Sequence, residues 1–140
     1  MDKEITLLNQ YWTDIYFALH YTHEEQISHQ AVRILQLIEK TNLNSVGDIA
    51  EYLKISHNTA SEHVKKLVHK GYLSKSRSAK DERKVILNLT KLGEDVLKKN
   101  TSLDESKLEK IMLSLSHQEK LDLINSFKLL YSSPSPIIYK

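Results

Sequence analysis

Residues 45–90, SVGDIAEYLKISHNTASEHVKKLVHKGYLSKSRSAKDERKVILNLT, decide the fold of this chain. The first half predicts two short helices joined by a tight connection at residues 54–55. Ser45 lies three residues before a carboxylate and is expected to cap the first helix, as Ser56 caps the second. Apolar residues recur at helical spacing through the second helix, and Gly71 is expected to end it because glycine accepts left-handed backbone geometry.

Two strands and a charged turn are expected after the second helix. Residues 72–75 predict one strand, and Val85, Leu87 and Leu89 alternate along a second strand that pairs back with one face inward. The intervening residues 77–84 are too polar to be buried and numerous enough to project. The sequence therefore predicts a winged helix-turn-helix, a mainly α fold with a two-stranded β wing.

Positive charge is gathered in the same stretch. Residues 61–84 hold eight Lys and Arg against three Asp and Glu, a net charge of +5, whereas the whole chain carries +2. Such an asymmetry indicates a polyanionic partner that meets this face. Charge alone also fits a solvated surface on an ordinary small domain. The order of helix, turn, helix and wing favours DNA.

The motifs in this stretch resemble the DNA-binding core of the MarR family of bacterial transcription regulators. The matching motifs are Ile49-Ala50, Ser56, Thr59-Ala60-Ser61, Leu67, Gly71-Tyr72-Leu73, Asp81-Glu82-Arg83 and Leu89-Thr90-Lys91-Leu92-Gly93. A less specific similarity continues from Leu115 to Leu130. The resemblance implies a sequence-specific DNA-binding regulator that represses, or occasionally activates, nearby genes as a homodimer. A two-fold dimer on double-stranded DNA calls for an inverted-repeat operator with about 10 bp between half-site centres.

The second helix and the wing supply the candidate DNA contacts. The candidates to read bases are His57, Asn58, Thr59, Ser61 and Glu62. The candidates for backbone and wing contacts are Lys65, Lys66, Arg77, Lys80, Asp81, Arg83 and Lys84.

Asp81 and Arg83 form a pair within the predicted wing. On an extended limb, side chains two residues apart point the same way, so the carboxylate would orient the guanidinium. The resemblance implies a place for this arginine in the DNA minor groove and for the aspartate in keeping the wing in shape. The alternative is a solvent-exposed ion pair that contributes only about 0–1 kcal/mol.

The flanking segments are expected to be helical. Ile5, Leu8, Trp12, Ile15 and Leu19 form a heptad-like seam on a helix over residues 4–21. This helix packs either inside its own subunit or, as the resemblance implies, against a second copy. Capping-box patterns at Ser102 and Ser116 predict two more helices. We expect dimerisation helices in residues 1–25 and 101–140, intertwined in a single domain with a DNA-binding lobe of residues 26–100.

The resemblance also implies an effector cleft between the dimer helices and the DNA-binding lobe. The candidates to line the cleft are Tyr16, Phe17, His20 and His23, although no residue pattern identifies a small-molecule ligand. His20 and His23 would share a helix face beside Glu24, which makes a metal-responsive regulator an alternative. Because no second cluster completes four ligands, we expect no metal and no cofactor. A winged-helix protein-interaction module without DNA binding is a further alternative.

Composition excludes several other classes of protein. By its length of 140 residues, the chain is expected to be one domain. Because it has no cysteine, disulfide bonds and thiol-based oxidation sensing are excluded. Apolar runs fall short of the about 20 residues that span a membrane, and the N-terminal residues lack a basic-then-apolar signal, so we expect a cytoplasmic protein without membrane association. No nucleophilic or phosphate-cradling motif supports an enzyme.

Overall fold

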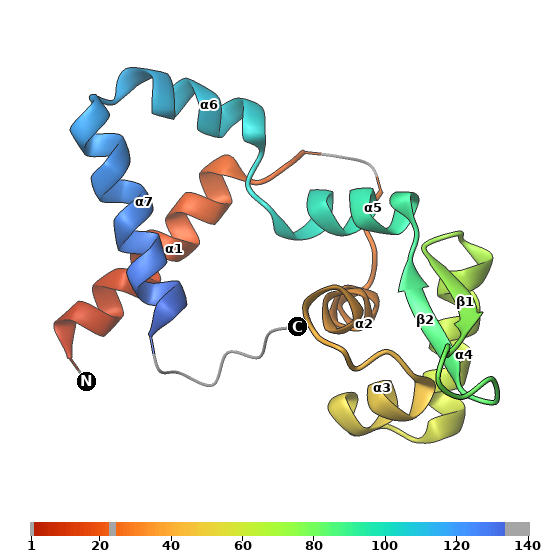
Figure 1. Cartoon of the computed structure of the whole chain (residues 1–140). Coiled ribbons are helices and arrows are strands. Elements are labelled where there is room, and N and C mark those ends of the chain that lie inside the picture. Colours follow the sequence, from red (N-terminus) through yellow and green to blue (C-terminus); the bar gives the residue numbers. More distant parts are fainter. Residues whose placement is uncertain (1, 23–24, 134–140) are drawn as a thin grey trace. The chain divides into compact units, whose positions relative to one another are not determined.

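The computed structural model describes residues 2–22 and 25–133, which separate into two compact units. Residues 25–101 form one unit, here called the winged lobe, and residues 2–22 with 102–133 form the other, the helical unit. The described residues contain seven helices and one two-stranded antiparallel sheet (Figure 1). The predicted mainly α fold with a two-stranded wing is confirmed.

The winged lobe holds four helices and the sheet. Its elements are α2 (His29–Lys40), α3 (Val46–Leu53), α4 (His57–His69), β1 (Leu73–Arg77), β2 (Val85–Leu89) and α5 (Lys91–Thr101). The helical unit holds the remaining three elements, α1 (Lys3–Leu19), α6 (Glu105–Ser114) and α7 (His117–Ser132).

One hydrophobic core holds the winged lobe together, and α2 runs through its centre. The buried apolar residues are Ile34, Leu35, Leu37, Ile38, Ile49, Ala60, Val64, Leu67, Tyr72, Leu73, Leu87, Val96 and Leu97. They come from every element of the lobe, and each fully buried Leu, Ile or Val side chain contributes about 1.5–3 kcal/mol. The core therefore fixes α4 and the two strands relative to one another within the lobe.

Local hydrogen bonds set the ends of α3 and α4 as the sequence predicts. Ser45 accepts from the Asp48 amide at 3.1 Å and donates its own amide to the Asp48 carboxylate at 3.1 Å, which confirms the capping box. Ser56 caps α4 by accepting from the Thr59 amide at 3.1 Å. Gly71, with φ of +82°, ends α4 in the left-handed region.

The segment from Thr90 to Gly93 ties the start of α5 to the turn after α4. The Thr90 hydroxyl donates to the carbonyl of Gly71 and accepts from the Gly93 amide at 3.0 Å. A Cβ atom at position 93 would lie 2.1 Å from the carbonyl oxygen of Tyr72, so only glycine fits there. Because Gly93 has no side chain, the backbone at the start of α5 can pack closely against the backbone at Tyr72.

Gly93→Ala is expected to destabilise the chain by about 1–3 kcal/mol or more, because the backbone must shift to admit the methyl group. The measurement is the midpoint of urea unfolding. Gly47→Ala is the matched control, since its Cβ would meet only the Ser45 hydroxyl at 3.8 Å. Alanine in a helix is favoured over glycine by about 1 kcal/mol, so the control is expected to be neutral or stabilising. Equal midpoints for the two variants would contradict this account.

Three predicted boundaries are wrong. The helix expected over residues 4–21 ends at Leu19, and His20 is its extended C-cap, so His20 does not lie on the helix face expected for it. The first strand spans Leu73–Arg77 instead of residues 72–75. Helix α6 is capped by Asp104, which accepts from the Ser106 amide at 2.9 Å, and not by Ser102. Leu103 instead forms a bridge with His20, and the Asp104 amide donates to the Leu19 carbonyl at 2.7 Å. Pairing with the end of α1 therefore delays the start of α6.

The predicted capping box at the start of α7 is confirmed. Ser116 accepts from the Glu119 amide at 3.1 Å and donates its own amide to the Glu119 carboxylate at 2.9 Å. The backbone hydrogen bond from Ser116, followed by the one from its side chain, holds the pKa of Glu119 below its ordinary value.

The helical unit exposes an extended set of large apolar side chains. No residue of α1, α6 or α7 is buried among the described residues. On the predicted seam of α1, Leu8 is 64% exposed and Trp12 is 54% exposed, while Ile15 and Leu19 are half-buried. Helix α7 exposes Leu121, Ile124, Phe127, Leu130 and Tyr131. Across residues 2–22 and 25–133, no helix has the length and apolar character needed to cross a membrane.

Candidate nucleic-acid interface

Helix α4 presents a polar face opposite the stripe that anchors it. Ala60, Val64 and Leu67 are buried, so their side of the helix faces the core. Of the five predicted base-reading residues, four are exposed and Ser61 is half-buried. With 3.6 residues per turn, Asn58, Glu62 and Lys65 fall within one narrow strip of this helix. The fold therefore brings polar side chains of different hydrogen-bonding character onto one accessible surface.

The N-terminal cap of α4 also restrains one of the candidate residues. The Thr59 hydroxyl accepts from the Ser56 hydroxyl at 2.8 Å, while its own proton remains available to donate. Thr59 is exposed, so the cap fixes the direction of its hydroxyl at the surface.

The two lysines predicted to contact the DNA backbone lie on different sides of α4. Lys65 pairs with Glu62 at 3.7 Å, and both side chains are mostly exposed. An exposed pair of this kind contributes about 0–1 kcal/mol, so either group is easily recruited by another partner. Lys66 lies about 100° further round the helix. There it lines a groove between α2 and α4 together with His63 and Lys70.

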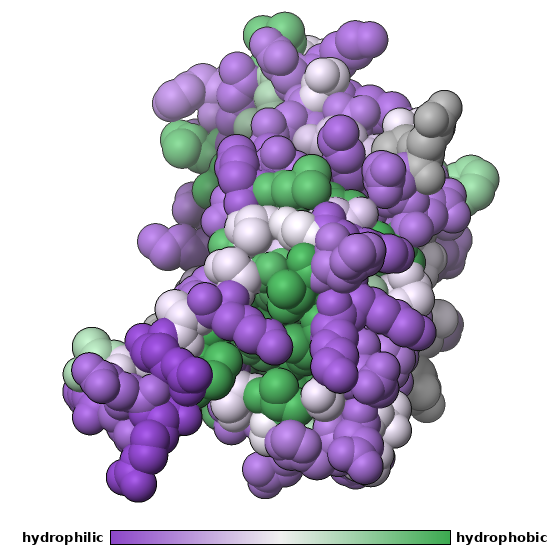
Figure 2. Space-filling view, turned by 90° about the vertical axis from the view of Figure 1, so that its right-hand side faces the viewer, coloured by the Kyte–Doolittle hydropathy of each residue, from purple (hydrophilic) through white to green (hydrophobic). Residues whose placement is uncertain are grey.

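The wing is a regular hairpin with an ordered tip. Antiparallel pairing runs from Leu73 opposite Leu89 to Arg77 opposite Val85. Beyond the strands, the Ser78 amide donates to the Lys84 carbonyl at 2.9 Å. In the space-filling view the tip stands out from the lobe as a strongly hydrophilic projection (Figure 2). All of the predicted wing cations, Arg77, Lys80, Arg83 and Lys84, are exposed.

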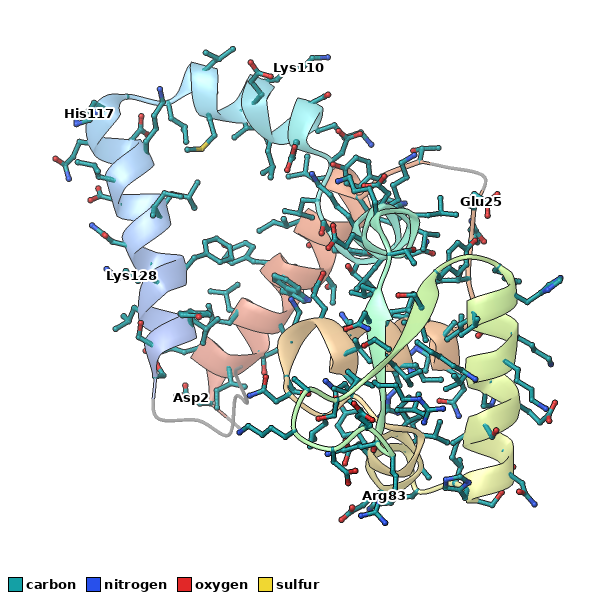
Figure 3. All side chains as sticks on the ribbon, turned by 45° about the vertical axis from the view of Figure 1, so that its right-hand side comes forward. Asp2, Glu25, Arg83, Lys110, His117 and Lys128 are labelled. Atoms are coloured by element: carbon teal, nitrogen blue, oxygen red, sulfur yellow. The ribbon has the colours of Figure 1, made fainter. Side chains whose placement is uncertain are left out.

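Asp81 shapes the tip, though not by the geometry that the sequence predicted. The expected extended limb is wrong, because residues 82–83 form a turn. The Asp81 carboxylate accepts from the Arg83 amide at 3.0 Å and lies 3.5 Å from the Arg83 Nε. The Arg83 side chain is 95% exposed and projects from the lobe (Figure 3). The Asp81 carboxylate therefore stabilises the turn and also orients the Arg83 side chain.

The base of the wing is fixed to the lobe. Leu73 and Leu87 are buried in the core, and the Leu87 amide donates to the Asn44 carbonyl at 2.8 Å. Lys75 is a further wing cation that the sequence analysis did not name among its candidates. It is exposed and shares one face of β1 with Arg77, and the two-residue alternation of a strand was the signal that pointed to it.

The predicted effector and metal residues are only partly described. Tyr16 stacks on His20 with ring centroids 5.5 Å apart, and the His20 Nδ1 lies 2.8 Å from the Tyr16 carbonyl oxygen. Phe17 is 81% exposed. His23 and Glu24 lie outside the described residues. Within the described ranges, no three His, Asp or Glu side chains are grouped so as to hold a metal ion.

Comparisons with known proteins agree with this geometry. The family model described as transcriptional regulator SarA/Rot matches residues 19–101. The HTH-type transcriptional regulator BilQ of Clostridium symbiosum is 33% identical over 79 residues, which cover 56% of this chain and 55% of BilQ.

Two solved structures from Thermotoga maritima share the fold. The transcriptional regulator Tm0710 is 28% identical, with a TM-score of 0.58 over 75% of this chain and 74% of that protein. The MarR-like transcriptional regulator tm0816 is 16% identical, with a TM-score of 0.61 over 94% of this chain and 95% of that protein. The predicted resemblance to MarR-type regulators is confirmed.

Proposed function

The chain belongs to the SarA/Rot family of transcriptional regulators, and from this premise we propose that it binds double-stranded DNA sequence-specifically through α4 and the wing. It is a winged-helix regulator of the MarR type and not an enzyme. The observation that carries the proposal is the accessible polar face of α4, held in the same lobe as a wing whose cations are all exposed. The winged lobe therefore carries both the residues that read bases and the cations that contact phosphates.

The polar face of α4 has the chemistry to distinguish base pairs in the major groove. An Asn side chain bonds adenine through two atoms, and a Glu carboxylate accepts from the amino group of cytosine. We assign these roles to Asn58 and Glu62, with His57, Thr59 and Ser61 as further reading residues. Lys65, Arg77, Lys80 and Lys84 neutralise phosphates, and Arg83 enters the minor groove.

A homodimer is the second part of the proposal. The described part of the chain leaves Leu8 and Trp12 of α1 exposed, together with the apolar residues of α7. Large apolar side chains exposed in this number are normally buried against a partner, and a second copy offers the same side chains by two-fold symmetry. Two copies present two α4 helices to an inverted repeat, and occupancy of that repeat represses the adjacent gene.

Lys65→Ala tests the phosphate contacts. It is expected to weaken binding to operator and random duplexes alike and to lower the slope of log affinity against log salt by about 1. Lys66→Ala is the matched comparison, and its effect is expected to be smaller because Lys66 lies on another side of the helix. Fluorescence anisotropy at several salt concentrations measures both slopes. A loss confined to the operator would assign Lys65 to base reading instead.

A gel shift over a range of salt concentrations separates this function from a winged-helix protein-interaction module. If the protein binds DNA by neutralising phosphate charges, its affinity must rise steeply as the salt concentration is lowered. Failure to bind any duplex at low salt would favour the interaction module.

A further inference from the structure

The turn that joins α3 to α4 (Figure 1) holds a lysine in a backbone conformation that lysine rarely adopts. Lys54 has φ of +56° and ψ of +46°, in the left-handed region. Among the described residues it is the only one other than a glycine with a positive φ. A side chain is disfavoured in this conformation because its Cβ atom lies too close to the following carbonyl oxygen, and glycine avoids that cost.

The same hydrogen-bond pattern ends α3 and α4, but with different residues. After α3, the amides of Lys54 and Ile55 donate to carbonyls three and five residues earlier, at 3.3 and 3.1 Å. After α4, the amides of Gly71 and Tyr72 do the same, at 3.0 and 2.9 Å. Both ends are Schellman motifs, in which the left-handed residue is usually glycine. The geometry of the turn therefore does not account for a lysine at position 54.

The fold fixes the backbone of Lys54 but not its ammonium group. Ile55 packs against the hydrophobic core, and Ser56 caps α4 by accepting from the Thr59 amide at 3.1 Å. The Lys54 side chain is exposed, and within the described ranges it forms no ion pair. The flexible four-carbon stem of a lysine leaves such an ammonium group available to a partner outside the chain.

Lys54 lies beside the end of α4 that carries the base-reading residues. It precedes His57 by three residues and Asn58 by four, and all three side chains are exposed. In helix-turn-helix proteins, the second helix contacts bases with its first residues, while the first helix crosses the phosphate backbone. Lys54 stands where the first helix passes into the second. Its ammonium group is therefore placed for a phosphate next to the bases that α4 reads.

We propose that Lys54 binds a DNA phosphate beside the base pairs read by the first turn of α4, and so helps to fix the register of α4 on the duplex. The inference rests on the proposed function and adds a contact from the turn, outside both α4 and the wing. Strained backbone persists at sites where it serves a function. Glycine at position 54 would make a more stable turn but would lose the phosphate contact.

Lys54→Gly tests the proposal because it removes the strain and the ammonium group together. Stability and DNA affinity are expected to move in opposite directions. The midpoint of urea unfolding rises, while the slope of log affinity against log salt falls by about 1 for each half-site occupied. At about 0.1 M salt this corresponds to about tenfold weaker binding for each half-site. Fluorescence anisotropy with operator and random duplexes measures the slopes.

Three further variants separate charge from backbone conformation. Lys54→Gln keeps a side chain on the left-handed backbone, so it is expected to lose the same slope without a change in midpoint. Lys54→Arg keeps the charge and is expected to keep the slope. Lys99→Gln removes an exposed lysine of α5 in the same lobe and is the matched control, with an unchanged slope.

Two results would overturn the proposal. One is an unchanged slope in Lys54→Gly or Lys54→Gln, which would leave Lys54 as a residue of the turn alone. The other is a lower unfolding midpoint in Lys54→Gly, which would mean that the lysine stabilises the turn. Failure of the unaltered chain to bind any duplex at low salt would contradict the proposed function instead, so the two failures are distinguishable.

Discussion

Leu8→Glu is expected to abolish the proposed dimer, leaving a monomer, and to weaken operator binding by about 100-fold or more. Leu8 is 64% exposed in the single chain and lies on the apolar seam of α1. A carboxylate on that seam would have to be buried without a partner when two copies associate, which is strongly unfavourable. A monomer contacts only one half-site, so it loses the gain in affinity that comes from binding two half-sites at once.

Analytical ultracentrifugation and operator titrations measure the two effects on the same samples. Leu92→Glu is the matched control, since Leu92 is 53% exposed but belongs to α5 of the winged lobe. It is expected to remain a dimer. If Leu8→Glu also remained a dimer with unchanged affinity, the seam of α1 would not be the interface between copies.

Arg83→Ala is expected to cost about 1–3 kcal/mol of DNA affinity while leaving dimerisation and thermal stability almost unchanged. The Arg83 side chain is 95% exposed, so its removal disturbs no packing. The expected loss comes from a contact made only when DNA is bound. Operator titrations by fluorescence anisotropy, paired with thermal unfolding, separate the two quantities.

Asp81→Ala is expected to weaken DNA binding nearly as much, although it removes a negative charge. Asp81 accepts from the Arg83 amide and lies 3.5 Å from the Arg83 Nε, so its loss releases the turn and the arginine together. Glu82→Ala is the matched control, because it removes an adjacent exposed carboxylate and is expected to leave affinity unchanged or slightly increased. Tighter binding by Asp81→Ala would mean that the wing acts only through its net charge.

Local interactions explain which parts of the fold are predictable from the sequence. Ser45, Ser56 and Gly71 act on backbone groups within a few residues of themselves, so their roles follow from spacing. The stripe of Ala60, Val64 and Leu67 follows in the same way from helical periodicity. These features settle where α3, α4 and the wing lie along the chain.

Contacts between distant segments explain what the sequence did not predict. The pairing of Leu103 with His20 delays the start of α6, and nothing near Ser102 signals it. One local feature was also missed, the turn at residues 82–83, in which the Asp81 carboxylate accepts from the Arg83 amide two residues further on. The groove between α2 and α4 joins residues far apart in the chain, so spacing along α4 does not reveal that Lys66 lines it.

Selection of bound DNA from a pool of random duplexes, with the purified full chain, tests the central claim most directly. The dimer with α4 and the wing as its reading surface predicts an enriched inverted repeat with about 10 bp between half-site centres. It also predicts that Asn58→Ala and Glu62→Ala each relax the preference at one base pair of each half-site. A pool without an enriched sequence, or with one enriched half-site lacking its inverted partner, would contradict the account.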